Sequence, residues 1–329
     1  MRSWLLLPGL AVFLLSAAPA RAQQVADSSF DTSVARPAYP RGTGPVVAID
    51  EAHFNFHTRG GRYLTMARLL ESDGYRVRSN TARFARPTLD SLAVLIIANA
   101  IGGEWDAGAY ARPGFTEAEV DAVRDWVTRG GSLLLVADHA PMGVAAENLA
   151  RRFGVTMSKG FTEDSTAYFN SGAFGPSILL FSRSNGLLRD HAITRGRDAS
   201  ERVDSVVTFT GQSLGAPPGA KVVLALSDQA FDHPPPTPEQ AAASGNPGSA
   251  WRTAVRGLPT TSARGRVVGL SLSLGKGRVI VLAEAAMLSA QAILNQSGQR
   301  VGIMGMNVPG IGNKQFALNA LHWLTRVLP

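Results

Sequence analysis

The 329-residue chain contains no cysteine. This absence excludes a cysteine nucleophile, a disulfide, a thiolate zinc or iron–sulfur site and the lipid-modified cysteine of a lipoprotein. Charged residues are few, at 17%, whereas hydrophobic residues make up 45% and glycine occurs 34 times. This balance is typical of a globular chain and not of a disordered or fibrous one. The length allows one large α/β domain or two small ones.

The sequence also lacks a run of five basic residues, although its formal net charge is +7. Lysine is scarce, and the arginines that supply most of the positive charge are spread along the chain. Because nucleic-acid binding needs clustered positive charge and stacking aromatic side chains, we expect no nucleic-acid partner. The chain has neither a P-loop nor a G-x-G-x-x-G motif, so nothing in it supports a nucleotide cofactor.

Residues 1–22 have the pattern of a cleaved secretory signal peptide. A short positive start precedes an apolar run over residues 5–18, and Ala20-Arg21-Ala22 forms a small-x-small cleavage site before Gln23. The run is short for a membrane span and has no stop-transfer flank, although a retained membrane anchor is the alternative. No later apolar run is long enough for a transmembrane helix. We therefore expect an exported protein, periplasmic or secreted, with no membrane span after cleavage and no lipoprotein anchor.

The rest of the chain predicts a leader followed by one domain. Residues 23–44 are polar and rich in serine, proline and arginine, which predicts a flexible leader. Residues 45–329 are expected to form a single α/β domain. In its first half, apolar strands alternate with amphipathic helices, and Thr116 and Glu119 form a capping box at one helix start. The strands are expected at 46–49, 75–78, 92–98 and 132–137, and the helices at 61–72, from 116 to 130, and up to about 153.

Strands that are apolar throughout and separated by helices indicate a mostly parallel sheet with helices on both faces. The second half is less regular, and the prolines at 234–236 open an excursion to 248 that cannot hold a central strand. We therefore expect irregular insertions there. Further strands are predicted at 203–210 and 221–226, a hairpin at 267–283 around Gly275-Lys276-Gly277, and a last helix at 312–328.

Polar side chains follow the predicted strands at the points where the strands end. Ligands bind beyond the carboxyl ends of parallel strands, so these side chains predict one shared site. Two asparagines in the glycine-rich loop before the last helix are expected to close over it. The strand-end residues are Asp50, Glu51, His53, His57, Asn99, Asp138, His139 and Glu284, and the loop asparagines are Asn307 and Asn313.

Six of these residues also have a structural interpretation. Asp50 and Asp138 can cap a helix or bind loop amides, and Glu284 can favour the positive end of a helix. His53 and His57 can lie on a surface loop. The histidine after Asp138 can be a satisfied structural residue. The occurrence of all of them at one edge of the sheet nevertheless favours a functional site.

Two kinds of chemistry would use this cluster. In general acid–base catalysis, His139 or His53 would act as the base and Asp138 or Asp50 would orient it, with Glu284 as a further catalytic candidate. Alternatively, imidazole and carboxylate groups would hold a divalent metal such as zinc, iron or manganese. The candidate metal ligands are His53, His57, Asp138 and His139, although their spacing is not diagnostic.

One literal motif match points to a different chemistry. Gly211-Gln212-Ser213-Leu214-Gly215 fits the G-x-S-x-G pattern of a nucleophile elbow. An elbow needs a tight turn from a strand into a helix. Here Ala216-Pro217-Pro218-Gly219 follows, and it cannot begin such a helix. We therefore predict that Ser213 is not a nucleophile.

Four of these segments resemble an uncharacterised family of the class I glutamine amidotransferase-like superfamily, related to domains of gliding-motility transport and intraflagellar-transport proteins. The resemblance covers most of residues 45–329 and implies a flavodoxin-like fold. The segments are Asp50-Glu51-Ala52-His53 with Phe56-His57, Gly130-Gly131-Ser132-Leu133-Leu134-Leu135, Asp138-His139, and Gly275-Lys276-Gly277-Arg278-Val279 leading to Glu284.

The resemblance also implies what this chain does not do. In true amidotransferases a cysteine occupies the sharp turn after a central strand, and here the corresponding turn is similar to Ala137-Asp138-His139-Ala140. Cysteine-dependent glutamine hydrolysis is therefore excluded. Related exported members occur in sugar-utilisation contexts, which implies a carbohydrate or polyol ligand by analogy of fold. Two hypotheses follow: a hydrolase-like enzyme, or a non-catalytic binding or scaffold domain for a small polar ligand or a protein partner.

Overall fold

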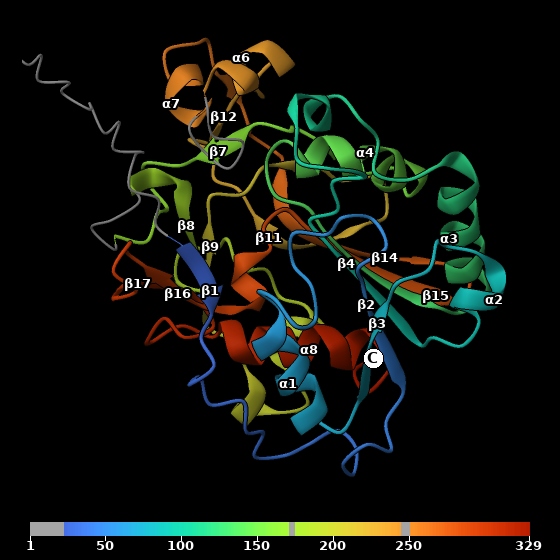
Figure 1. Ribbon diagram of the computed structural model, residues 1–329. Helices are drawn as coiled ribbons and strands as arrows, with labels where there is room; N and C mark the ends of the chain where they lie inside the picture. The colour runs from blue at the N-terminus through green and yellow to red at the C-terminus, as the bar shows by residue number, and fades with distance from the viewer. Residues whose placement is uncertain (1–22, 171–174, 245–250) are drawn as a thin grey trace, which may run out of the picture.

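The computed structural model describes residues 23–170, 175–244 and 251–329 (Figure 1). The predicted signal peptide lies outside the described residues. The largest sheet in the described chain has nine strands, of which five neighbours run parallel and the others are antiparallel to their partners. In spatial order they are β3 (Arg76–Asn80), β2 (Val46–Asp50), β4 (Val94–Ala98), β5 (Ser132–Val136), β15 (Gly277–Leu282), β14 (Val267–Leu274), β10 (Leu214–Gly215) and β6 (Thr156–Met157), with β11 (Lys221–Ala225) also on β14.

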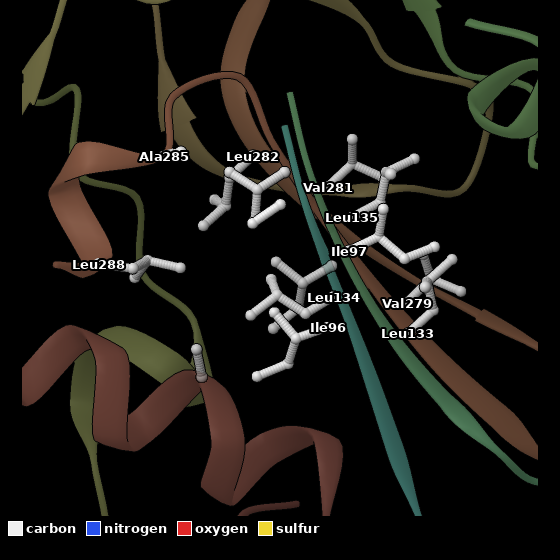
Figure 2. Close-up of a cluster of buried hydrophobic side chains, with 14 of the residues drawn as sticks. Ile96, Ile97, Leu133, Leu134, Leu135, Val279, Val281, Leu282, Ala285 and Leu288 are labelled. Carbon is white, nitrogen blue, oxygen red and sulfur yellow. The ribbon is translucent and has the colours of Figure 1, made fainter. Parts of the chain in front are cut away.

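The parallel strands follow one another across the sheet as the second, first, third, fourth and fifth along the chain. The inner strands β2, β4, β5 and β15 are mostly apolar because both faces of the sheet are buried there, whereas the edge strand β3 is polar and partly exposed. Figure 2 shows Ile96, Leu134 and Leu282 on the side of the sheet nearer a helix, with Leu135 and Val281 on the other side. All five side chains are at most 1% exposed. The predicted mixed α/β domain with a mostly parallel sheet is confirmed.

Helices cover the sheet on both sides. Figure 1 shows α1 and α8 on one side and α3 and α4 on the other. The predicted capping box opens α3, because Glu119 N donates to Thr116 Oγ1 and Thr116 N donates to Glu119 Oε2. No helix in the described part of the chain is long and apolar enough to cross a bilayer. The α-helices are α1 (Leu64–Ser72), α2 (Arg86–Leu89), α3 (Glu117–Arg129), α4 (Met142–Arg152), α5 (Ala192–Arg195), α6 (Pro238–Ala243), α7 (Trp251–Val255) and α8 (Asn313–Leu324).

Insertions in the second half build smaller sheets beside the main one. The predicted hairpin is confirmed, because β14 and β15 pair antiparallel around Gly275, whose φ of 56° suits glycine. The proline-rich excursion carries α6, and α7 follows the excursion in the chain; both helices lie over β7 and β12 in Figure 1. The small sheets are β1 (Gln23–Ala26), β16 (Ala290–Leu294) and β17 (Arg300–Gly305); β13 (Thr261–Ser262), β12 (Phe231–His233) and β7 (Phe161–Glu163); and β8 (Ile178–Ser182) with β9 (Ser205–Phe209). Short 3-10 helices are η1 (Ala107–Tyr110), η2 (Gly175–Ser177), η3 (Ala199–Glu201) and η4 (Ala286–Leu288).

The segment 23–44 differs from the predicted flexible leader, because it is bonded to the domain. Strand β1 pairs antiparallel with β16. Asp27 accepts hydrogen bonds from Asn307 and Arg300, both at 2.9 Å. Further along, Ala38 N donates to Asp73 Oδ1 at 2.7 Å. The partners lie far away in the sequence, so the polar composition of the segment did not reveal them.

Candidate functional site

Asp138 stands at the carboxyl edge of the sheet, directly after β5, and its side chain is partly exposed. Its Oδ2 accepts a hydrogen bond from Asn99 Nδ2 at 2.8 Å. Its Oδ1 accepts one from Ala285 N at 2.6 Å. Asn99 follows β4 and Ala285 lies just beyond β15, so three adjacent strand ends fix the position of one carboxylate. This is the shared strand-end position that the sequence predicts.

Asn99 links Asp138 to a buried histidine. Its φ of 53° lies in the left-handed region, which asparagine tolerates better than most residues. Its Oδ1 accepts from Asp138 N at 2.9 Å, and its Nδ2 also lies 3.2 Å from His57 Nδ1. Because the amide nitrogen donates, His57 Nδ1 accepts, and the proton of the neutral ring lies on Nε2. That Nε2 is buried and has no hydrogen-bond partner among the described residues.

Glu284 lies beside Asp138 and is fully buried. Its two oxygens accept from Ala286 N at 2.7 Å and Met287 N at 2.9 Å. Burial, together with the charge of Asp138, raises the pKa of Glu284 to about 8. Burial also raises the pKa of Asp138 to about 6, against the hydrogen bonds from Asn99 and Ala285 N. Glu284 is therefore protonated at neutral pH, and Asp138 carries the charge of the pair.

This assignment predicts a carboxyl group that titrates far above the ordinary range. In carbon-13 NMR spectra of the side-chain carboxyls, one glutamate is expected to titrate near pH 8. The signal is expected to disappear in Glu284→Gln and to remain in Glu239→Gln, whose carboxyl is on the surface. Titration of every glutamate carboxyl below pH 6 would contradict the assignment.

Two arginines act on Asp138. Arg62 lies just before α1, and its guanidinium carbon is 3.7 Å from the centre of the Phe56 ring. Arg252 belongs to α7, and its positive charge acts on Asp138. Burial lowers the pKa of both arginines, and the charge of Asp138 opposes that effect. Both guanidinium groups stay protonated, because arginine does not lose its proton in proteins.

Tyr63, next to Arg62, supports the carboxylate indirectly. Its hydroxyl donates to Ala285 O at 3.1 Å. Ala285 N donates to Asp138, so the bond from Tyr63 anchors the residue that supplies this donor. The side chain of Tyr63 is fully buried.

His139 is buried next to the site, but Asp138 does not orient it. Its Nδ1 lies 2.9 Å from Ala140 O and must donate to that carbonyl. Its ring meets Trp251 edge-on, with centroids 5.3 Å apart. Burial and the charge of Arg252 lower the pKa of His139 to about 3. At neutral pH the ring is therefore a weak base, and the expected Asp138–His139 hydrogen bond is not formed.

His53 belongs to a separate buried network. Its Nδ1 is 2.8 Å from Asp50 Oδ2 and its Nε2 is 2.9 Å from Glu119 Oε1. The ring packs against Phe84 and Phe115. Burial opposes protonation, but the hydrogen bonds and charges of Asp50 and Glu119 outweigh it and raise the pKa of His53. Both nitrogens are engaged and the side chain is 0% exposed, so His53 is not available to a substrate as the predicted base.

The predicted metal ligands do not come together as a ligand set. Over residues 23–170, 175–244 and 251–329, no three histidine, aspartate or glutamate side chains are grouped so that they could hold a metal ion. His53 is occupied by two carboxylates, and His139 by a backbone carbonyl. His57 and Asp138 are both bonded to Asn99. The residues therefore do not fit a divalent metal.

The remaining predicted ligand residues are bonded within the fold and are not grouped around Asp138. Glu51 Oε1 accepts from Arg59 N and Ser79 Oγ, both at 2.8 Å. Asn313 bonds the backbone of Val207 and Met287, so it does not close over Asp138. The other two are Asp50, which bonds His53 and Asn80, and Asn307, which bonds Asp27 and Gln291 O.

The G-x-S-x-G match supplies a supporting residue and no accessible nucleophile. Ser213 is fully buried and its hydroxyl donates to Asp232 Oδ2 at 2.6 Å. The next residues form strand β10, so no helix follows the serine. Gln212 Nε2 instead donates to Ala137 O and Asp138 O, both at 2.9 Å, and holds the turn that carries the site.

Four residues near Asp138 were not singled out from the sequence. Arg62 and Tyr63 follow the polar loop after the first strand, and their place there was the only signal. Arg252 lies just after the excursion, in a segment without a motif. Gln212 was inside a motif that we assigned to no function.

Among the described residues, cavities are also found away from Asp138. One, of about 490 Å³, is bordered by Tyr39 and Arg68 among others. The second, of about 560 Å³, is bordered by Arg36, Lys314 and their neighbours. They provide alternative binding positions against which a ligand site at Asp138 can be tested.

No protein-family model and no curated protein matches the chain. Among solved structures it is similar to the mmIFT52 N-terminal domain, with 14% identity and a TM-score of 0.56 over 85% of this chain and 97% of that chain. It is also similar to a putative ThuA-like protein from Bacteroides uniformis ATCC 8492, with 15% identity and a TM-score of 0.44 over 87% and 94%. A cytoplasmic protein from Salmonella typhimurium has 11% identity and a TM-score of 0.45 over 85% and 99%. At these identities the first likeness shows a shared fold and not a shared activity.

Proposed function

We propose that this chain is an exported member of the class I glutamine amidotransferase-like superfamily that binds a small polar, carbohydrate-like ligand at Asp138. The motifs around Asp50, Asp138 and Glu284 support the superfamily. The strand order 2-1-3-4-5 supports a flavodoxin-like sheet. The fold shared with the mmIFT52 N-terminal domain fits the resemblance to intraflagellar-transport domains.

The single observation that carries the ligand site is the position of Asp138. A partly exposed carboxylate, fixed through both oxygens by donors from two neighbouring strand ends, is prepared to accept hydrogen bonds from hydroxyl groups. Beside it, His57 Nε2 is a buried donor without a partner in the described chain. A polyhydroxylated ligand can satisfy both groups, because each hydroxyl can donate and accept.

The test is a binding screen with neutral sugars and polyols. Wild-type protein and Asp138→Asn would be compared by thermal shift, and each compound that binds would be measured by calorimetry. We expect at least one compound to bind the wild type and to depend on Asp138. Binding that is unchanged in Asp138→Asn would contradict the proposal.

A hydrolase-like activity is a second candidate, and the pKa of Asp138 favours it. A carboxyl group with a pKa of about 6 suits a general base near neutral pH, whereas His57 and His139, each with a pKa lowered to about 3, do not. Activity of this kind would rise with pH as Asp138 ionises. The wild type and Asp138→Asn would be compared on a panel of hydrolase substrates. If no substrate is turned over in a way that depends on Asp138, the hydrolase-like activity is eliminated.

Export is proposed from the signal-peptide pattern of residues 1–22, in which the small-x-small site Ala20-Arg21-Ala22 precedes Gln23. Mass spectrometry of protein recovered from the periplasm or medium of a bacterial host is expected to give a chain that starts at Gln23. An intact start at Met1 in a purely cytoplasmic protein would contradict cleavage.

A further inference from the structure

Two arginines near Asp138 are not paired with it. The oxygens of Asp138 and Glu284 are bonded to an asparagine amide and to backbone N–H groups. Arg62 and Arg252 both act on Asp138 electrostatically. In the described structure neither guanidinium group is bonded to either carboxyl group, so both positive charges at this edge lack an ion-pair partner.

Neighbouring carboxylates do not pair with Arg252 either. Glu163 is the other acid whose charge acts on Arg252. Its oxygens are already bonded to Arg256 at 2.7 Å and to His233 at 3.0 Å. Arg252 itself has no hydrogen-bond or ion-pair partner within the described ranges. It is half-buried, so water screens its charge less than at the open surface.

Two buried hydrogen-bond donors near Asp138 also lack partners. His57 is 3% exposed, and its Nε2–H is buried without a partner in the described structure. Asn99 holds its ring beside Asp138 and fixes this tautomer. Arg62 Nε is a second buried donor without a partner there. Buried donors are normally paired, and these two lie in the loop after β2 that leads to the same edge.

We infer that the ligand of this site is a small hydroxylated anion, whose anionic group is bound by Arg252 and Arg62 while a hydroxyl group donates to Asp138. The inference rests on the proposed ligand site and adds its chemical class. Arginine suits this role because its planar fork of donors matches the oxygens of a carboxylate or a phosphate. The structure favours both anions through the same donors, so the experiment includes one of each.

The test uses matched compounds that differ in the anionic group. Gluconate would be compared with sorbitol, and glucose 6-phosphate with glucose, by calorimetry at constant ionic strength. The wild type is expected to bind at least one anion about tenfold or more tightly than its neutral partner, as a charged hydrogen bond allows. If the anion is preferred in only one of the two pairs, that pair identifies whether the site binds a carboxylate or a phosphate.

Variants assign the preference to this site. Arg252→Gln is expected to reduce the preference to less than about twofold, and Arg252→Lys, which keeps the charge, to retain part of it. Arg129→Gln, which removes an exposed arginine paired with Asp90 at the far end of α3, is the control and is expected to leave it unchanged. Circular dichroism would show that each variant is folded.

The possible failures can be told apart. If the neutral compounds bind as tightly as the anions or more tightly, the inference that the ligand is an anion is wrong, and the proposed ligand site at Asp138 still stands. A preference that survives unchanged in Arg252→Gln also overturns the inference, because the anion is then bound elsewhere. If neither member of either pair binds, both the inference and the proposed function fail for this class of compound.

Discussion

Replacing His53 by alanine is expected to lower the free energy of unfolding by about 3–5 kcal/mol at pH 7, the cost of breaking a buried ion pair by removing one partner. The imidazolium separates Asp50 from Glu119, with contacts of 2.8 and 2.9 Å. Without it, two buried carboxylates would face each other in a space lined by Phe84 and Phe115. Urea unfolding followed by circular dichroism measures the loss.

The pH dependence of this contribution has two limits. The pKa of His53 is raised in the folded state, so its contribution is complete below the unfolded value of 6.5 and is lost as the pH rises through the folded value. The pKa of Glu119 is lowered to about 2, mainly by hydrogen bonds from His53 and Thr116 that outweigh burial. The stabilisation that Glu119 contributes is present above its unfolded pKa of 4.5 and is lost as the pH falls towards 2.

A matched control is His191→Ala. His191 Nε2 lies 3.0 Å from Ser271 Oγ and its Nδ1 accepts from Ile193 N, so no carboxylate is bonded to its ring. Removal of the His191 side chain is expected to lower the free energy of unfolding by about 1 kcal/mol, as for other helix-capping groups. Equal effects of the two substitutions, or a loss below 1 kcal/mol for His53→Ala, would refute the buried network.

Replacing Asp138 by asparagine is expected to weaken binding of a neutral polyol by about 10- to 100-fold, the range of a hydrogen bond to a charged group. The amide has one acceptor oxygen where the carboxylate has two, and it carries no charge. If the ligand is hydrolysed, loss of the general base is expected to reduce kcat by about 10²- to 10⁴-fold. Calorimetry and steady-state kinetics measure these effects.

Asp204→Asn is the control for this prediction. Its side chain is 70% exposed and is paired with surface arginines, so its replacement is expected to leave ligand affinity unchanged. His53→Ala, measured under conditions where it is folded, is likewise expected to retain the affinity. Wild-type affinity in Asp138→Asn would place the ligand elsewhere.

The central fold could be predicted because its signals are local. The run that forms β4 is apolar at every position and the run that forms β5 is apolar after Ser132, as expected for strands buried on both faces. Thr116 and Glu119 lie three residues apart and could be recognised as a cap. The pairing of β1 with β16 could not be predicted in this way, because it joins residues near 25 to residues near 292.

The candidate site could be predicted only in part. Strand ends placed Asp138, Asn99 and Glu284 at one edge, and the structure brings these three together. His53 has the same position in the sequence pattern, but its ring turns into the core because Glu119, 66 residues away, accepts from its second nitrogen. Arg252, which acts on Asp138, lies in a segment with no motif. Its role could not be predicted because it depends on how the insertion folds over the sheet. Tertiary packing, and not local pattern, decided both outcomes.

The most direct test of the account is an NMR titration of the protein with the tightest neutral polyol from the screen. Binding at Asp138 predicts shifts of the Asn99 side-chain amide, the His57 Nε2–H and the Ala285 N–H, which surround the carboxylate. The side-chain amide of Asn313, which is buried against backbone carbonyls, is expected to stay unchanged. Shifts confined to the cavity beside Tyr39 and Arg68, with none at Asn99 or Ala285, would contradict the assignment of the site.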